Sequence, residues 1–232
     1  CVAKPKTYVS RYSKKIFKPI LITNNNQLED FMNNHHIDDF YYQEFLEGRS
    51  LYLLYYFYKD GMFMKFSQEN FIQQSHGRSI LAAKSAAYHM SEHSIPYENL
   101  FQTIGYTGLV MIEVKETKNS VYMIEANPRF WGPSQLFVDA EINFFEALLY
   151  DYGLLLTRPE NNLVSNNVTS YFWDDGVSYL EKNIDFTAFH NYSKQQFLNE
   201  YDQWKNSNIL NREDTLNIHQ KLIQGVISEK CE

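Results

Sequence analysis

The chain has 232 residues, of which 44% are hydrophobic and 16% aromatic, with a formal net charge of -7 at pH 7. This apolar content suffices for a sizeable core in one large domain or two small ones. The acidic balance disfavours nucleic-acid binding, and the sequence lacks an apolar run of about 18 residues that would span a membrane. Cys1 and Cys231 show neither disulfide nor metal-ligand spacing, which favours a reducing compartment, and we expect a cytoplasmic protein.

The first half of the chain predicts short elements. Strands are expected at 1–6, 20–23 and 40–45, with a helix at 26–34. Residues 51–66 have the pattern of a hairpin that turns at Lys59-Asp60-Gly61. Residues 79–93 are rich in helix-forming residues, and a second helix is expected at 97–105.

The second half begins with another expected hairpin at 108–127, followed by a short helix at 144–150. Composition then changes, and the polar segment 157–170 is typical of a connection. A strand and turn at 170–179 and helices at 195–204 and 213–229 complete the prediction.

The hairpin at 108–127 carries two glutamates. Asn119 lies six residues from both Glu113 and Glu125, so a turn symmetric about Asn119 would make the two carboxylates face each other. Their Cβ atoms would then be about 4.5–5.5 Å apart, and like charges at that distance destabilise a sheet. A divalent cation would offset the repulsion, and Mg²⁺ commonly binds one or two carboxylates together with substrate phosphates.

Asn127 and Arg129 follow Glu125 at alternate positions and share its expected face. They offer an amide oxygen for the cation and a guanidinium for phosphate oxygens. The alternative is a solvated face whose glutamates point to water. We expect Met111, Val121 and Met123 on the same face, which argues against that alternative.

The E-x-N-x-R pattern, with a strand glutamate twelve residues earlier, resembles the ATP-grasp superfamily. The segments "QEFLEG" and "IEANPRFWG" resemble its carbamoyl-phosphate-synthase-like group most. The resemblance implies that Glu113, Glu125 and Asn127 bind the Mg²⁺ or Mn²⁺ ions that bridge ATP phosphates. It also implies that Arg129 assists phosphoryl transfer.

The segment "YYQEFLEGRSLYL" resembles the hinge strand with which that family reads adenine. The carbonyl of Glu44 would accept from the adenine amino group, the amide of Leu46 would donate to a ring nitrogen, and Gly48 would let the chain turn. Ser50 stands where many relatives carry an acidic residue for the ribose. The implied nucleotide contacts are Gln43, Glu44, Phe45, Leu46, Ser50 and Met111. The alternative for this stretch is an aromatic core strand.

The opening "CVAKPK" resembles the family's strand that ends in Lys-Pro, and the resemblance makes Lys4 a phosphate-binding and catalytic residue. The family's glycine-rich phosphate loop is absent after it, and "TYVSRYSKKIFKP" stands there with Ser10, Ser13 and Lys14 as alternative phosphate contacts.

The segment "QQSHGRSILAAKS" lies between hinge and glutamates, where relatives often approach a carboxylate substrate. Arg78 could pair with that carboxylate, His76 could act as acid or base, and Gly77 would permit close approach. A surface turn is the alternative.

The resemblance implies an α+β fold of mostly antiparallel sheets flanked by helices. Residues 1–155 would form the ATP-grasp region, with a small lobe at about 1–50 and a large lobe at about 51–155, and residues 156–232 a small accessory region. Family members normally have more chain before the lysine, so we expect an upstream domain of the same protein.

The implied activity is an ATP- and Mg-dependent ligase that joins a carboxylate to an amine through an acyl phosphate. Its partners would be those two small molecules, and a homodimer is left open. One alternative is a degenerate nucleotide-binding module. The other is an interaction protein in which Glu113 and Glu125 do not converge.

Overall fold

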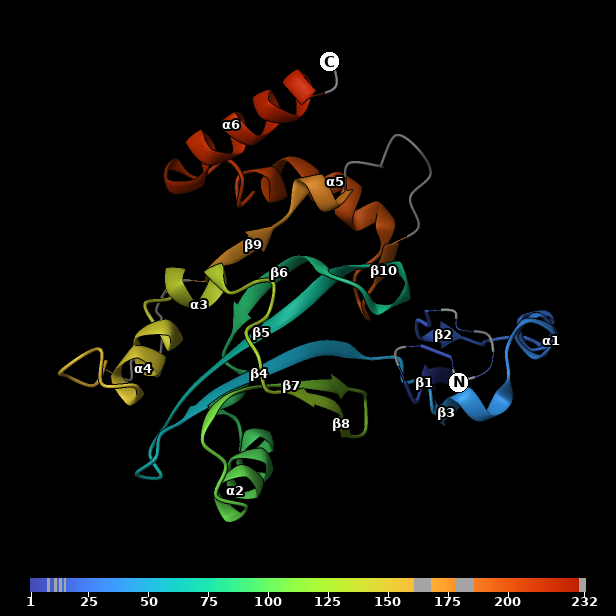
Figure 1. The fold of residues 1–232 in the computed structure, drawn as a ribbon, viewed down its shortest axis with the longest axis horizontal. Coiled ribbons are helices and arrows are strands. Elements are labelled where there is room, and N and C mark those ends of the chain that lie inside the picture. Colours follow the sequence, from blue (N-terminus) through green and yellow to red (C-terminus); the bar gives the residue numbers. More distant parts are fainter. Residues whose placement is uncertain are drawn as a thin grey trace.

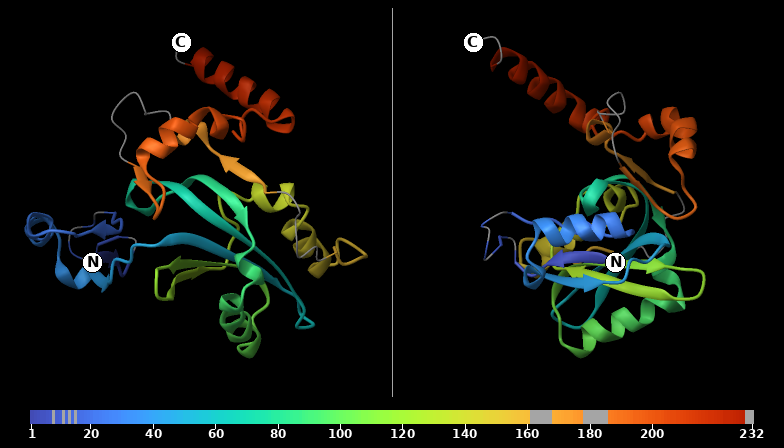
Figure 2. Two further views of the ribbon diagram at one scale, coloured as in Figure 1. Left: turned by 180° about the vertical axis from the view of Figure 1, so that it is seen from behind. Right: turned by 90° about the vertical axis from the view of Figure 1, so that its right-hand side faces the viewer.

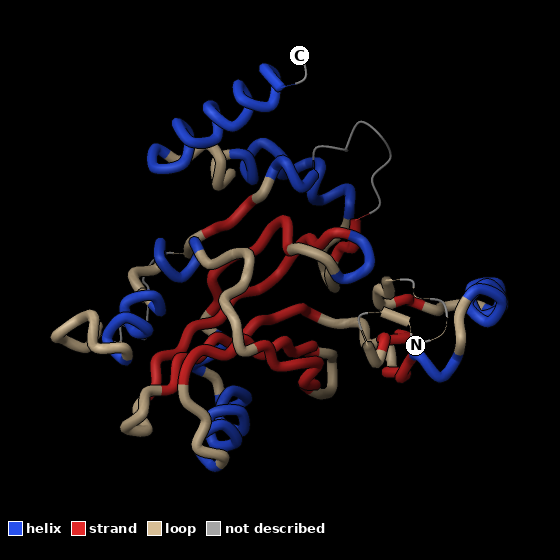
Figure 3. The backbone as a smooth tube through the Cα atoms, viewed as in Figure 1, coloured by secondary structure: helices blue, strands red, loops and turns tan. Residues whose placement is uncertain are grey.

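The computed structural model of the chain describes residues 1–7, 9–10, 12, 14, 16–160, 168–177 and 186–229. Two sheets with helices against them form this part of the chain, and every pairing between its strands is antiparallel (Figures 1 and 3). The predicted class of antiparallel sheets flanked by helices is confirmed.

The smaller sheet has three strands in the order β2-β1-β3. Its elements are β1 (Val2–Pro5), β2 (Ile20–Leu21), α1 (Asn25–Asn34), a short 3-10 helix η1 (Ile37–Asp39) and β3 (Phe40–Gln43). The helix begins after Asn24, whose side chain accepts a hydrogen bond from the Gln27 amide. Phe31 of the helix packs on Phe40 and Ala3 of the sheet and forms the separate core of this lobe.

The larger sheet has seven strands in the order β8-β7-β4-β5-β6-β9, with β10 paired to β5. Its strands are β4 (Arg49–Phe57), β5 (Phe63–Gln74), β6 (Ile80–Ala86), β7 (Gly108–Glu116), β8 (Val121–Asn127), β9 (Ser170–Phe172) and β10 (Phe186–Ala188). Its helices are α2 (Ile95–Thr103), α3 (Gln135–Asp139), α4 (Phe144–Asp151), α5 (Lys194–Lys205) and α6 (Glu213–Glu229). Short 3-10 helices η2 (Ser75–Gly77), η3 (Tyr88–Met90), η4 (Glu92–Ser94) and η5 (Asp174–Val177) connect them.

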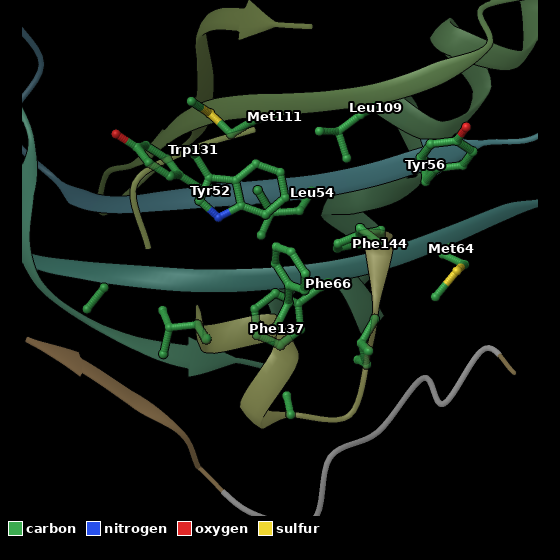
Figure 4. Packing of buried hydrophobic residues seen from close by; sticks show 14 of the residues in the cluster. Tyr52, Leu54, Tyr56, Met64, Phe66, Leu109, Met111, Trp131, Phe137 and Phe144 are labelled. Carbon is green, nitrogen blue, oxygen red and sulfur yellow. The ribbon is translucent and has the colours of Figure 1, made fainter. Parts of the chain in front are cut away.

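Both faces of strand β4 are covered. Side chains such as Leu51 and Leu53 pack beneath Phe101 of α2. The alternate residues, including Leu54, pack with Phe137 of α3 and Phe144 of α4 (Figure 4). This double covering explains why β4 is almost continuously apolar.

The expected helical character of residues 79–93 is wrong. Ile80–Ala86 is strand β6, paired with β5 on one side and β9 on the other, and 3-10 turns follow it. Helix propensity is a weak preference that tertiary context overrides. Here Ala82 and Ala83 are fully buried within the sheet, and pairing on both edges satisfies their backbone groups.

The region after residue 168 joins the large sheet. Strand β9 extends it at β6, β10 pairs with β5, and α5 packs Phe197 and Trp204 on the far end. Helix α6 projects away from the sheet (Figure 2). The domain limits near residues 50 and 155 stay predictions. Within the described ranges, no helix has both the length and the apolar character needed to span a membrane.

Candidate functional site

The two glutamates of the β7–β8 hairpin face each other as predicted, with Glu113 directly opposite Glu125. The symmetric turn from which we predicted this facing does not form. Near the turn, Glu116 pairs with Val121, so the hairpin is not symmetric about Asn119. A register shift between Glu113 and Val114 adds one residue to β8 and brings the carboxylates into line.

The same bulge corrects the expected face of two apolar residues. Met123 pairs with Val114 and Val121 pairs with Glu116, so both lie on the opposite face from Glu125. Val121 packs in the core beneath α2. Only Met111 shares the glutamate face as expected, and it is buried in the cluster with α3 and α4.

Glu113 is the more buried of the two glutamates. Burial, with a further contribution from the charge of Glu125, raises the pKa of Glu113, and the cations Lys115 and Lys4 oppose that shift. The side chain of Glu125 is 44% exposed and lies 3.6 Å from the Lys4 ammonium group. The carboxylate pair is therefore electrostatically strained, and additional positive charge would relieve it.

The cation beside the carboxylates of Glu113 and Glu125 belongs to the smaller sheet. Lys4 lies on β1 of the small lobe, yet its Nζ reaches Oε2 of Glu125 on β8. Asn127 donates from Nδ2 to Oε1 of Glu125 at 2.7 Å, which orients that carboxylate. The structure thus brings Lys4, Glu113, Glu125 and Asn127 together where the two lobes meet.

Arg129 follows β8 and is exposed. Its Nη1 donates to the carbonyl of Phe130 at 3.2 Å. Its charge acts on the buried Tyr52, whose pKa is raised by burial and by the charges of Glu113 and Glu125 and lowered by Arg129. Arg129 therefore acts on the same buried side chain as the carboxylate pair, and its exposed guanidinium is accessible to an anion.

The row of side chains at the carboxylate pair continues across the sheet. Glu113 pairs with Tyr52 on β4, and Tyr52 pairs with Gln68 on β5. Gln68 is fully buried, and its Oε1 has no hydrogen-bond partner among the described residues. Sequence reasoning missed Tyr52, Gln68 and the neighbouring Lys115. Lys115 could have been found, because it lies two residues after Glu113 on an alternating strand.

The expected hinge, residues 43–48, connects β3 of the small sheet to β4 of the large one. Gln43 ends β3, Phe45 is 41% exposed and Leu46 is half-buried. Gly48 is required because its backbone packs directly against β7, and not because the chain turns there. An added Cβ would overlap the carbonyl oxygen of Glu116. The fully buried Ser50 accepts a hydrogen bond from Nδ2 of Asn70 at 3.1 Å.

The residues predicted to contact a carboxylate substrate lie in the segment between β5 and β6. Among the described residues, none of them makes a contact with Glu113 or Glu125. Arg78 is exposed at the β5–β6 turn, and its carbonyl accepts from Gln73. Gly77 has φ +68° and open space around it, so it serves the turn instead of a close approach. The side chain of His76 lies outside the described part of the chain.

The alternative phosphate contacts near Lys4 are also separate from the carboxylates. Ser10 is buried and donates to Asp39 at 2.6 Å, which ties it to the small lobe. Lys14 is exposed at φ 58°, and Ser13 is outside the described residues.

The donor set fits a hard divalent cation. Two carboxylates and one amide oxygen are suitable ligands for Mg²⁺ when substrate oxygens and water complete the shell. Within the described ranges, no group of three or more His, Cys, Asp or Glu side chains could hold a metal by itself. The facing of Glu113 and Glu125 is the geometric reason that a cation would be accommodated here.

The sequence matches no protein-family model, and no curated protein is similar to it in sequence. The structure is similar to that of N5-carboxyaminoimidazole ribonucleotide synthetase from Thermus thermophilus. The TM-score is 0.51 and the identity 17%, over 65% of this chain and 42% of that chain.

A βγ-ATP complex of biotin carboxylase from Campylobacter jejuni gives a TM-score of 0.48 at 16% identity, over 64% of this chain and 35% of that chain. The chain therefore spans less than half the length of either solved structure. At such low sequence identity, the structural similarity establishes the fold and nothing more. The chain contains part of an ATP-grasp fold.

Proposed function

We propose that the protein binds Mg·ATP between its two lobes and uses it to activate a carboxylate for attack by an amine. The observation that carries the proposal is the facing pair Glu113 and Glu125, with Lys4 delivered to it from the other sheet. Maintaining two facing carboxylates costs stability unless a cation is bound, so a site for one is the simplest reason for their presence.

Each residue has a role that follows from its position. Glu113, Glu125 and Asn127 would hold Mg²⁺, which when bound neutralises phosphate charge. Lys4 and Arg129 carry positive charge at the same place and would stabilise the transferred phosphoryl group. The chain's contribution is positioning and electrostatics, and the proposal needs no nucleophilic side chain.

Nucleotide binding is tested by thermal unfolding with and without Mg·ATP. Ligand at 100 times its Kd adds about 2.7 kcal/mol of stability, which is an easily measured shift. We expect the shift in the wild type and its loss in Glu125→Gln. Glu116→Gln is the matched control, because Glu116 lies on the other face of β7 and pairs with Arg49. That variant should keep the ligand-induced shift.

Ligase chemistry is tested by release of ADP in the presence of candidate carboxylates. Hydroxylamine would trap an acyl phosphate as a hydroxamate, so carboxylate-dependent hydroxamate formation that Glu125→Gln abolishes is the expected result. The absence of any Mg·ATP-induced shift in the wild type would refute nucleotide binding.

The second candidate is a nucleotide-binding module without ligase activity. It is favoured by residues 7–19, which contain no glycine where the resembled family has a glycine-rich phosphate loop. A normal Mg·ATP-induced shift without hydroxamate from any carboxylate would favour this candidate.

A further inference from the structure

Lys115 is a half-buried cation beside the carboxylate pair. It lies two residues after Glu113 on β7 and on the same face, opposite Ser50 of β4. Among the described residues, no carboxylate lies within ion-pair distance of its ammonium group and no hydrogen bond from it is found. The charge of Glu113 raises the pKa of Lys115 against the larger lowering by burial, but the two side chains form no direct ion pair, so the ammonium group can still accept an anion brought by a ligand.

The contact that Lys115 does make comes from the far end of the chain. Its Nζ lies 4.4 Å from the ring centroid of Phe189, a cation–π distance. Phe189 is 7% exposed, and its amide donates to the carbonyl of Phe71 on β5. It follows β10, which pairs with β5. The C-terminal region therefore reaches the face of the sheet that carries the candidate site.

The position of Lys115 along β7 defines what it could contact. On one side is Glu113, at the proposed phosphate end of the nucleotide. On the other is Glu116, against which Gly48 of the hinge segment packs closely. Lys115 thus lies between the metal-binding end and the segment expected to read the base. In a nucleotide bound across both, the group between them is the ribose with its α-phosphate, and the α-phosphate carries the charge.

We infer that Lys115 binds the α-phosphate of the nucleotide and that Phe189 of the C-terminal region positions it. This inference rests on the proposed nucleotide site. Residues 186–192 then line that site, and the ring of Phe189 holds the ammonium group of Lys115 in place.

The test measures the affinity of the protein for Mg·ADP, Mg·ATP and adenosine by calorimetric titration. Lys115→Met should weaken both nucleotides by about tenfold or more, because it removes a charge-assisted contact. Affinity for adenosine, which lacks phosphate, should not change. Lys115→Arg should retain most of the affinity. Phe189→Leu keeps the apolar volume but removes the ring face, and it should lower the affinity for both nucleotides about two- to fivefold.

Lys84 provides the matched control. Its Nζ lies 4.9 Å from the ring of Trp204, so it too links the sheet to a C-terminal aromatic residue. It belongs to β6 and pairs with Ser170 and Glu69, away from the carboxylates. Lys84→Met should leave nucleotide affinity unchanged.

The outcomes separate this inference from the proposed function. Wild-type binding that Glu125→Gln weakens and Lys115→Met does not would overturn the role of Lys115 alone. A Lys115→Met variant with normal nucleotide affinity but a raised KM for the carboxylate would place the substrate, instead of the α-phosphate, at Lys115. Failure of the wild type to bind any nucleotide would overturn both proposals.

Discussion

Replacing Glu113 with glutamine should stabilise the protein in the absence of ligand. Glu113 faces Glu125 in the ladder, and directly opposed side chains have Cβ atoms about 5 Å apart. Two unit charges at that separation repel by about 3 kcal/mol at an effective dielectric constant of about 20. Glu125 is 44% exposed and paired with Lys4, and the charges of Lys115 and Lys4 offset part of the repulsion at Glu113. We therefore expect a net effect of about 1 kcal/mol.

The measurement is the Tm of wild type and Glu113→Gln without metal or nucleotide. For a chain of this size, about 1 kcal/mol corresponds to about 2–4 °C. The dependence on pH has a definite sign. Because the pKa of Glu113 is higher in the folded state, the folded protein binds the proton more tightly than the unfolded chain does. The contribution of Glu113 to the stability of the unliganded wild type therefore falls as pH rises from about 4.3 through the raised pKa.

The variant should lose this pH-dependent component and also the stabilisation by Mg·ATP. Glu116→Gln is the control for the chemical change, because Glu116 lies on the same strand in a 2.6 Å ion pair with Arg49. That substitution should lower the Tm. A lower Tm for Glu113→Gln as well would refute the view that the carboxylate pair is strained.

Three further results are expected. Gly48→Ala should cost about 1–3 kcal/mol by chemical denaturation, since its Cβ would overlap Glu116; unchanged stability would contradict that contact. Ser193→Ala removes the capping box that Ser193 and Gln196 form at the start of α5 and should cost about 1 kcal/mol. An equal loss from Gln203→Ala, at an exposed position of the same helix, would discount the cap. Glu113 must ionise to bind Mg²⁺, and its pKa is raised, so the affinity for Mg²⁺ should begin to fall at a higher pH than an ordinary glutamate would cause. An affinity that falls only where an ordinary glutamate titrates would contradict this.

The sequence alone was sufficient for the elements whose signals are local. The hairpins around Gly61 and Asn119 follow from alternating apolar runs separated by turn residues, and both form. The class of an antiparallel fold flanked by helices was also predicted correctly, from motifs that are local in the sequence. These features depend on neighbours along the chain, so residue order carries the information.

Tertiary structure decided the features that depend on distant segments. The bulge that aligns Glu113 with Glu125, and turns Val121 to the opposite face, arises from pairing within the folded sheet. Ile80–Ala86 is a strand because β5 and β9 pair with it, which outweighs the helix propensity of its alanines. The approach of Lys4 to Glu125, and of Phe189 to Lys115, joins residues that are far apart in the sequence. No local pattern encodes such contacts, because burial and pairing across the whole domain determine them.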